Sequence, residues 1–414
     1  MADGSLTGPQ IPAHATSSPL RASWRGLPAS LRVALIYLGA RAITTAIMLG
    51  VAAFAAPGSR HGPNPSVFDF VLGWDAQWYW LIAESGYPLT LPTGVDGAVV
   101  ENAWAFMPVY AYLAKWVGFG VWGAGALFIS LLSGYLACLV FYRLMCERLD
   151  RSAATWAVIF LACGPMAAMF QVGYAESLAL LWLLLALWCV VHRRFGWLYL
   201  LVPLMGFTRP GVLAFALMLA MYGIWRWMRR RSDPLPPTQI VHIVALGLFS
   251  ALVGFAWPVI VGFATGDAGA YLATGRAWRE PWVVEGGVGP FSAWVQGTEF
   301  CFGRAWGLGA VTGYVVLALL LGGAAAALLL LPCVRRLQVE VRLWAAAYIV
   351  YLLAVFFPQS SVFRLLFPLS PLWGAVAVPR SPWWRGGVFV ACVLGQWCWI
   401  ALMYGVGTAY WQVP

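Results

Sequence analysis

Residues 73–87 read GWDAQWYWLIAESGY, and this stretch follows the first long apolar segment of the chain. It places two carboxylates, Asp75 and Glu84, among tryptophan and tyrosine rings. Carboxylates are costly in or near lipid, so they are retained there chiefly for a function. Aromatic rings favour the membrane boundary and also stack on the faces of sugars. The stretch therefore predicts chemistry on a polar substrate that reaches the protein from lipid.

The composition is that of an integral membrane protein. Of the 414 residues, 62% are hydrophobic and 10% are charged, whereas a soluble domain carries about 25% charged residues. Apolar runs of about 18 residues, the length that crosses a bilayer as a helix, recur along the chain. The net charge of +10 comes from short basic clusters between these runs. That distribution fits the positive-inside rule, so we expect no nucleic-acid partner.

The cysteines and histidines give no sign of a disulfide framework or a metal site. The eight cysteines lie in or beside apolar runs without CxxC spacing, and the four histidines are scattered. We therefore expect no cofactor and no dedicated metal ligands. Arginine greatly outnumbers lysine, which indicates a GC-rich bacterial genome and hence a bacterial plasma membrane.

Residues 1–30 are polar and rich in Pro, Ser and Ala, which predicts a disordered cytoplasmic N-terminus. They lack the apolar core and cleavage site of a signal peptide, so the first apolar run should remain as a membrane helix. We expect residues 31–414 to form a single integral membrane domain.

The apolar pattern predicts an all-α polytopic bundle of about eleven transmembrane helices. We place them at residues 31–56, 120–142, 152–170, 174–191, 197–208, 210–227, 238–264, 306–332, 342–357, 362–379 and 386–406. The pair 197–208 and 210–227 could instead be a broken or re-entrant pair. Residues 104–118 are predicted as a re-entrant or surface helix that does not cross.

Charge patterning sets the orientation. The segments predicted to be cytoplasmic hold Arg21, Arg25, Arg32, Arg143, Arg148, Arg151, Arg193, Arg194, Arg226, Arg229, Arg230, Arg231, Arg335, Arg336, Arg342, Arg380 and Arg385. Most acids fall on the other side: Asp69, Asp75, Glu84, Asp96, Glu101, Glu176, Asp267, Glu280, Glu285 and Glu299. The positive-inside rule therefore puts the N-terminus in the cytoplasm. Two long external loops follow, 57–103 and 265–305, which should carry short amphipathic helices.

Asp75 is the first candidate for chemistry. On an external loop it could act as a general base for a substrate delivered from lipid. The alternative, at even odds from local sequence, is a helix N-cap, because a short helix is predicted at 76–85. Glu84 lies nine residues later, on the opposite face of that helix, so it is an orienting partner or a solvated acid.

Further candidates lie at outer helix ends. Glu176, in GYAES, is either a dipole-favoured acid of a first helical turn or a site residue. Arg209, in FTRPG, and Arg364, in PQSSVFR, are interpreted as phosphate ligands, with internal ion pairs as the alternative. Arg41 lies deep in the first apolar helix and is expected to form an ion pair with an acid such as Asp75 or Glu176.

Other residues of the two loops are weaker candidates. Arg276 and Arg279 would either bind an anionic head group or anchor an interfacial helix. The rings of the first loop are either an interfacial belt or substrate contacts. The full set of predicted substrate-binding residues is Trp74, Trp78, Tyr79, Glu84, Tyr87, Glu176, Arg209 and Arg364.

Four motifs, in this order and spacing, resemble the PIG-V family. They are WDAQWYWLIAESGY, NAWAFMPVY at 102–110, GYAES at 173–177 and FTRPG at 207–211. These proteins are the second mannosyltransferases of glycosylphosphatidylinositol assembly and their bacterial relatives, in the GT-C class of membrane glycosyltransferases. The resemblance covers most of the chain and implies a GT-C-like bundle.

The resemblance also implies a reaction. The donor would be a polyprenyl-phosphate sugar, polyprenyl-phosphate mannose above all, and transfer would be inverting, on the non-cytoplasmic face. Asp75 would be the catalytic base, and Arg209 or Arg364 would stabilise the departing phosphate. The acceptor would be a hydroxyl of a glycolipid or a protein. There are two alternatives. One is a lipid or solute transporter, and the other is a non-catalytic partner subunit of another glycosyltransferase in the membrane.

Overall fold

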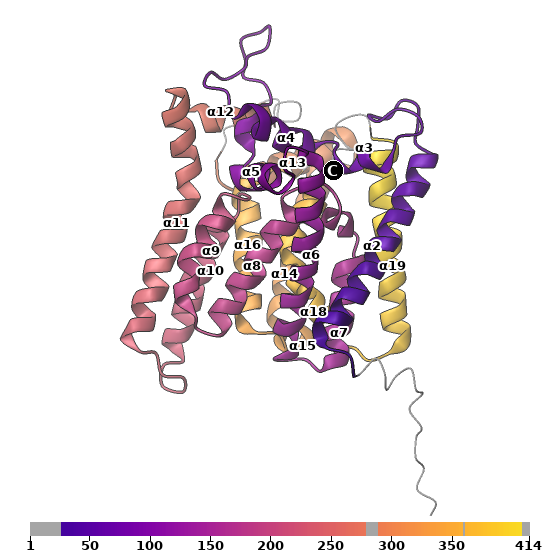
Figure 1. Cartoon of the computed structure of the whole chain (residues 1–414). Coiled ribbons are helices and arrows are strands. Elements are labelled where there is room, and N and C mark those ends of the chain that lie inside the picture. The colour runs from indigo at the N-terminus through magenta and orange to yellow at the C-terminus, as the bar shows by residue number, and fades with distance from the viewer. Residues whose placement is uncertain (1–25, 279–288, 359–360, 408–414) are drawn as a thin grey trace, which may run out of the picture.

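The computed structural model describes residues 26–278, 289–358 and 361–407. Within these ranges the chain is helical, and the one β feature is an isolated bridge between Thr93 and Val99. The elements drawn in Figure 1 are α2 (Ala29–Ala53), α3 (Val67–Val71), α4 (Asp75–Ser85), η1 (Ala103–Ala105), α5 (Pro108–Val117), α6 (Trp122–Cys146), α7 (Arg151–Cys163), η2 (Ala167–Phe170), α8 (Glu176–Val191), η3 (Phe195–Trp197), α9 (Leu198–Gly206), α10 (Val212–Met228), α11 (Pro237–Thr265), α12 (Ala270–Ala277), α13 (Ser292–Thr298), η4 (Glu299–Ala305), α14 (Ala310–Leu330), α15 (Pro332–Arg335), α16 (Val339–Val355), α17 (Val362–Leu365), η5 (Phe367–Leu372), α18 (Trp373–Val376), α19 (Pro382–Ile400) and η6 (Ala401–Gly405).

Five helices of the described chain are long and apolar enough to cross a membrane: α2, α6, α11, α14 and α19 with its η6 extension. Four shorter apolar helices, at Arg151–Cys163, Glu176–Val191, Phe195–Gly206 and Val212–Met228, stand among them. The chain is therefore an all-helical integral membrane protein, as predicted, while the number of about eleven spans is not confirmed.

Two predicted spanning helices are broken, and proline explains both breaks. The helix expected at 152–170 ends at Cys163, because Gly164 and Pro165 follow it. The helix expected at 362–379 is three short pieces, α17, η5 and α18, with Pro368 and Pro371 inside η5. Proline lacks an N–H and clashes with the preceding turn, so it disfavours one continuous α-helix through either segment.

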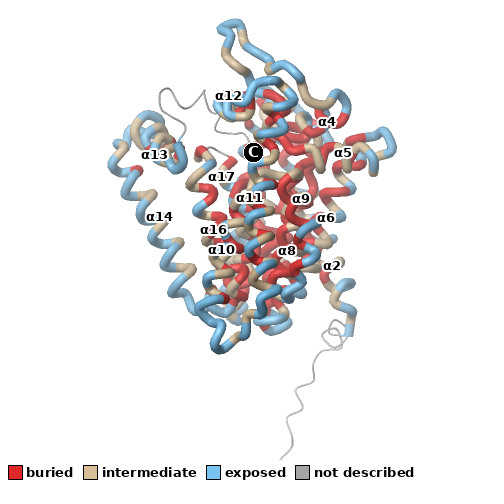
Figure 2. Tube along the Cα trace, turned by 90° about the vertical axis from the view of Figure 1, so that its left-hand side faces the viewer, coloured by how far each residue is buried: buried red, intermediate tan, exposed pale blue. Residues whose placement is uncertain are grey.

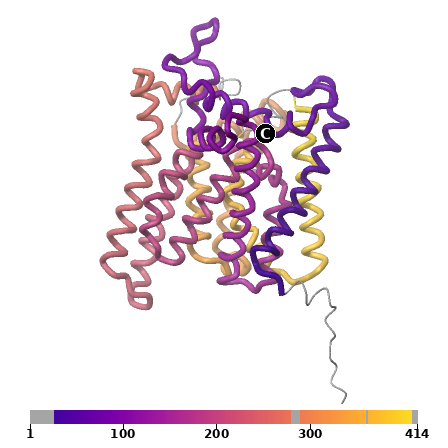
Figure 3. The backbone as a smooth tube through the Cα atoms, in the orientation of Figure 1, coloured from indigo at the N-terminus to yellow at the C-terminus, as the bar shows by residue number. Residues whose placement is uncertain are grey.

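The two long loops gather at one end of the bundle, as Figure 1 shows for α3, α4, α5, α12 and α13. The arginine-rich turns, such as those between α6 and α7 and between α10 and α11, lie at the other end, where α2 begins (Figure 3). This separation of charge is the one that the positive-inside rule describes. The predicted cytoplasmic tail 1–30 lies mostly outside the described residues.

The short helix α5 folds back instead of crossing. Its ten residues are about 15 Å long, half of what a bilayer core requires. Val121 donates its N–H to the Gly118 carbonyl at 2.9 Å, which closes the turn into α6. Residues 104–118 therefore do not form a spanning helix, as the charge pattern predicted.

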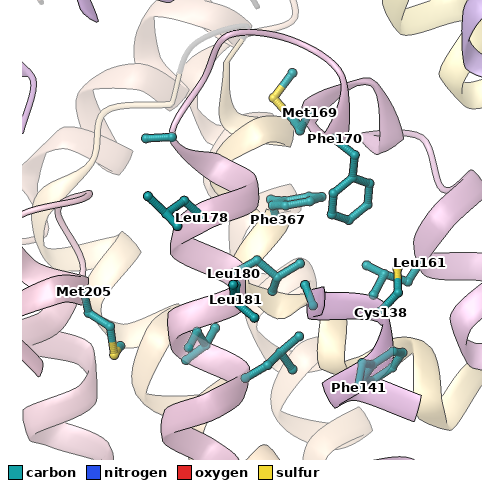
Figure 4. Close-up of a cluster of buried hydrophobic side chains, with 14 of the residues drawn as sticks. Cys138, Phe141, Leu161, Met169, Phe170, Leu178, Leu180, Leu181, Met205 and Phe367 are labelled. Carbon is teal, nitrogen blue, oxygen red and sulfur yellow. The ribbon is translucent and has the colours of Figure 1, made fainter. Parts of the chain in front are cut away.

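The helix α8 is largely buried in the middle of the bundle. Figure 2 shows buried residues concentrated on the inner helices, whereas α14 is almost entirely exposed and is suited to contact lipid. Side chains of α6, η2 and η5 pack around α8 (Figure 4), among them Cys138, Phe141, Phe170 and Phe367. A helix that is apolar on every side is typically buried, and α8 carries its first residue, Glu176, into the interior of the protein.

Close packing of α5 on α6 depends on Gly125, which gives a first prediction. A β-carbon there would lie 2.0 Å from the carbonyl oxygen of Ala114. Gly125→Ala should therefore lower the stability of the protein by about 1–3 kcal/mol, measured as thermal unfolding in detergent. Gly247→Ala on α11, with no atom within 4 Å, is the matched control and should cost nothing. Equal melting temperatures for the two variants would contradict the proposed packing.

Candidate active site

Four charged side chains from distant parts of the chain meet at the loop-bearing end of the bundle. Asp75 is the first residue of α4 and Glu176 the first residue of α8. Arg209 lies in the turn between α9 and α10, and Arg364 is part of α17. Two acids and two arginines make a cluster without net charge, which we call the charge quartet.

Arg364 joins the two acids of the quartet. Its Nη1 donates a hydrogen bond to Asp75 Oδ2, and its Nε lies 3.4 Å from Glu176 Oε1. Arg209 Nη1 donates to the same Glu176 oxygen. The four side chains are between 2% and 17% exposed. Buried charges are tolerated only when paired, so the two arginines and two carboxylates depend on one another.

Asp75 is held by its surroundings, and its side chain does not cap the helix. The N-cap position belongs to Trp74, and the helix start has no side-chain cap hydrogen bond. Trp74 has a φ of 51°, which is strained for a bulky residue and frequent at functional sites. The N-cap interpretation of Asp75 is therefore wrong. Burial raises the pKa of the Asp75 carboxyl, and the positive charge of Arg364 opposes that rise.

Tyrosines surround the quartet. The Tyr174 ring lies 5.4 Å from the Arg364 guanidinium, and the Tyr404 hydroxyl donates to the Tyr174 hydroxyl at 3.2 Å. Tyr348 anchors the quartet from α16, because its hydroxyl donates to the Leu365 carbonyl at 2.8 Å. None of these three was predicted. Tyr174 lies within the GYAES motif and could have been found there, whereas Tyr348 and Tyr404 arrive by tertiary contact.

A pocket opens beside the quartet. Its polar lining is Glu176, Arg209 and Arg364, and its other walls are mainly apolar side chains of α8, α9, α10, α16 and η5. These walls include Leu180, Leu183, Met205, Val212, Trp344 and Phe367. From Glu176 to Leu183 the helix α8 advances about 10 Å, so the pocket is charged at one end and apolar along its depth.

Glu84 is not part of this site. It lies at the far end of α4, is 41% exposed on its side chain and pairs with Lys115 at 3.5 Å. The substrate contacts predicted in the first loop likewise fall into two groups, one beside the quartet and one away from it. Tyr79, one turn after Asp75, is buried on the side of the quartet.

Trp78 and Tyr87 belong to aromatic clusters between the two loops. Trp78 stacks on Phe106 with ring centroids 5.9 Å apart. Tyr87 stacks on Trp104 at 4.4 Å and donates its hydroxyl hydrogen to the Phe106 carbonyl. These contacts hold the loop in place, and neither ring is among the residues that line the pocket.

Arg41 pairs with backbone carbonyls and with none of the described acids, contrary to the prediction. Its guanidinium donates to the carbonyls of Ala162 and Ala167 at 2.6 Å each and lies over the rings of Tyr37 and Phe170. Ala162 stands in the last turn of α7, where unpaired carbonyls and the helix dipole attract a cation. The break after Cys163 thus supplies the partner that an acid was expected to supply.

Two other predictions concern cofactors and the second loop. In the described ranges no group of three or more His, Cys, Asp or Glu residues could hold a metal ion. Arg276 lies in the last turn of α12, and Arg279 lies outside the described residues.

Comparison with known proteins shows a distant similarity to solved structures and no match in sequence. No family profile and no curated protein sequence matches the chain. One solved structure that resembles it is the Archaeoglobus fulgidus oligosaccharyltransferase with Zn and sulfate, at TM-score 0.45 and 16% identity over 88% of this chain and 53% of that one. Another is the archaeal oligosaccharyltransferase AglB with an inhibitory peptide and a dolichol-phosphate, at TM-score 0.44 and 14% identity over 89% and 56%.

The chain spans about half the length of these proteins. Fold and site thus define an all-helical integral membrane protein with a buried charge quartet beside a mainly apolar pocket. The resemblance to the PIG-V family stays a prediction.

Removing one acid from the quartet should be costly. Glu176→Gln leaves Arg209 without its carboxylate partner and should destabilise the protein by about 3–5 kcal/mol, because a buried charge is left uncompensated. Glu84→Gln removes an exposed pair and should cost less than about 1 kcal/mol. Thermal unfolding of both variants in the same detergent provides the comparison. Similar losses would show that the quartet is not buried as described.

Proposed function

We propose that this chain is an inverting glycosyltransferase of the GT-C class. In this proposal it moves a mannosyl residue from polyprenyl-phosphate mannose to an acceptor hydroxyl on a lipid-linked or protein acceptor. The reaction takes place at the loop-bearing end of the bundle, on the non-cytoplasmic face. The observation that carries the proposal is a buried carboxylate, Asp75, in direct contact with an arginine that lines a mainly apolar pocket.

The pocket suits a lipid phosphate. Arg209 and Arg364 present guanidinium groups, whose planar fork matches phosphate oxygens. The apolar side chains that continue below them offer a surface for a hydrocarbon chain. A polyprenyl phosphate combines these two features in one molecule. The resemblance of the four motifs to the PIG-V family supports mannose as the sugar that it carries.

The chemistry needs one base and one stabilised leaving group. An acceptor hydroxyl attacks the anomeric carbon of the donor sugar, and its proton passes to the Asp75 carboxylate. The bond between that carbon and the phosphate oxygen breaks, and its electron pair stays on the phosphate. Arg209 and Arg364 stabilise the charge that develops there. A single displacement of this kind inverts the anomeric carbon, as single-step glycosidic displacement does.

Environment favours Asp75 for this role. Burial raises the pKa of the Asp75 carboxyl, so it accepts a proton more readily than an exposed aspartate. Glu176 lines the pocket but is paired with both arginines, so its role is to neutralise and orient them.

Loss of the Asp75 carboxylate should abolish transfer. Asp75→Asn is expected to lower the rate at least about 100-fold, because the amide cannot accept the acceptor's proton. Transfer would be measured from radiolabelled polyprenyl-phosphate mannose into the lipid and protein fractions of membranes supplied with the purified chain. Asp96→Asn, in an exposed part of the same loop, is the matched control and should keep wild-type activity.

The outcomes separate the parts of the proposal. Wild-type rates in the folded Asp75→Asn variant would remove Asp75 as the base. Transfer of another polyprenyl-linked sugar, with mannose ignored, would correct the donor and keep the class. A purified wild-type chain that transfers no sugar would favour a non-catalytic partner subunit.

A further inference from the structure

Arg364 stands between the pocket and the candidate base. It lines the pocket together with Arg209 and Glu176, whereas Asp75 is not among the lining residues. Its Nη1 nevertheless donates to Asp75 Oδ2, and within the described residues this is the one side-chain hydrogen bond of the Asp75 carboxylate. The same guanidinium therefore faces the space for a lipid phosphate and occupies the oxygen that would receive a proton.

Arg209 provides the internal contrast. It lines the same pocket, but among the described residues its acid partner is Glu176 and not Asp75. An anion in the pocket can thus draw on Arg209 without breaking a direct contact of Asp75. It cannot take Arg364 without weakening the contact of Arg364 with Asp75.

Charge balance favours a change of partner by Arg364, from Asp75 to an anion in the pocket. The quartet is neutral, since two arginines offset two carboxylates. A phosphodiester in the pocket adds one negative charge, which competes with both carboxylates for the guanidinium groups. Arg364 already has a 3.4 Å contact with Glu176 and a ring contact with Tyr174, so it can remain held while it turns away from Asp75.

We propose that Arg364 couples donor binding to the base: its guanidinium pairs with Asp75 before the donor binds and turns to the donor phosphate when the pocket fills, which releases Asp75 for the acceptor hydroxyl. This inference rests on the proposed function and deepens it. It makes Arg364 a positioning residue for the base as well as a phosphate ligand. It also sets an order, in which the donor binds before the acceptor is deprotonated.

The exchange has a defined effect on the protonation of Asp75. Arg364 opposes the burial that raises the Asp75 pKa, so its departure lets the pKa rise further. Loss of one close opposite charge corresponds to about one to three pH units. The other groups that act on Asp75, or that feel its charge, are Glu176, Arg209, Tyr79, Glu101, Tyr174 and Tyr404. None of them contacts Asp75 as Arg364 does.

The test is a titration of Asp75 in the full chain reconstituted in lipid nanodiscs. A hydrophobic carbodiimide reacts with protonated carboxyl groups, and peptide mass spectrometry reports the modified fraction of Asp75 at each pH. The probe is a polyprenyl phosphate without sugar, compared with the same polyprenol without phosphate. Glu340, a carboxyl at the arginine-rich end of α16, is the internal reference.

Polyprenyl phosphate should raise the midpoint of Asp75 labelling by about one to three pH units. The polyprenol should leave it in place, and Glu340 should respond to neither. In Arg364→Gln the Asp75 midpoint should be high without lipid and should not respond to it. In Arg209→Gln, which keeps the contact between Arg364 and Asp75, the midpoint without lipid should lie below that of Arg364→Gln.

Bound polyprenyl phosphate with an unmoved Asp75 midpoint in the wild-type chain would overturn the coupling and leave the proposed function standing. Binding is followed separately by native mass spectrometry of the nanodisc complex. A chain that neither binds polyprenyl phosphate nor transfers sugar would overturn both. The wild-type titration decides the question even where Arg364→Gln does not fold.

Discussion

The burial of four compensating charges is the constraint on which the described architecture of the loop-bearing end depends. Asp75, Glu176, Arg209 and Arg364 come from separate elements and have little contact with water. None could be buried alone, because an unpaired charge in a low-dielectric interior costs several kcal/mol. The pairing therefore ties the first loop to α8, to the turn after α9 and to α17.

The helices around the quartet serve this arrangement. The apolar α8 carries Glu176 into the interior, and the turn after α9 brings Arg209 to it. In the segment after α16, the short helix α17 places Arg364 against both acids, and η5 with its two prolines follows it. Leu365, Phe367 and Pro368 of this segment line the pocket, whose walls are mainly apolar where the quartet does not line it. A site for an amphiphilic anion thus follows from the way in which the charges are buried.

The sequence predicted which residues belong to the quartet, but it did not predict which of them pair with one another. Hydrophobicity and the positive-inside rule placed Asp75, Glu176, Arg209 and Arg364 at one end of the bundle, although nothing in the chain shows which acid meets which arginine. Local spacing separated Asp75 from Glu84, because nine residues of helix turn one away from the other.

The wrong predictions have physical reasons. Arg41 finds backbone carbonyls at the end of α7, and a partner that belongs to the backbone leaves no trace in side-chain patterns. The N-cap interpretation of Asp75 followed helix statistics, which tertiary pairing with Arg364 overrides. Tyr348 and Tyr404 were missed because distant elements bring them to the site.

The central claim is that one site holds a lipid phosphate on two arginines and presents its sugar to Asp75. A cryo-electron microscopy structure of the chain in nanodiscs with polyprenyl-phosphate mannose tests it most directly. The account predicts phosphate oxygens about 3 Å from the guanidinium nitrogens of Arg209 and Arg364, with the mannose beside Asp75. A donor bound elsewhere, with Arg364 still paired to Asp75 and the pocket empty, would contradict it.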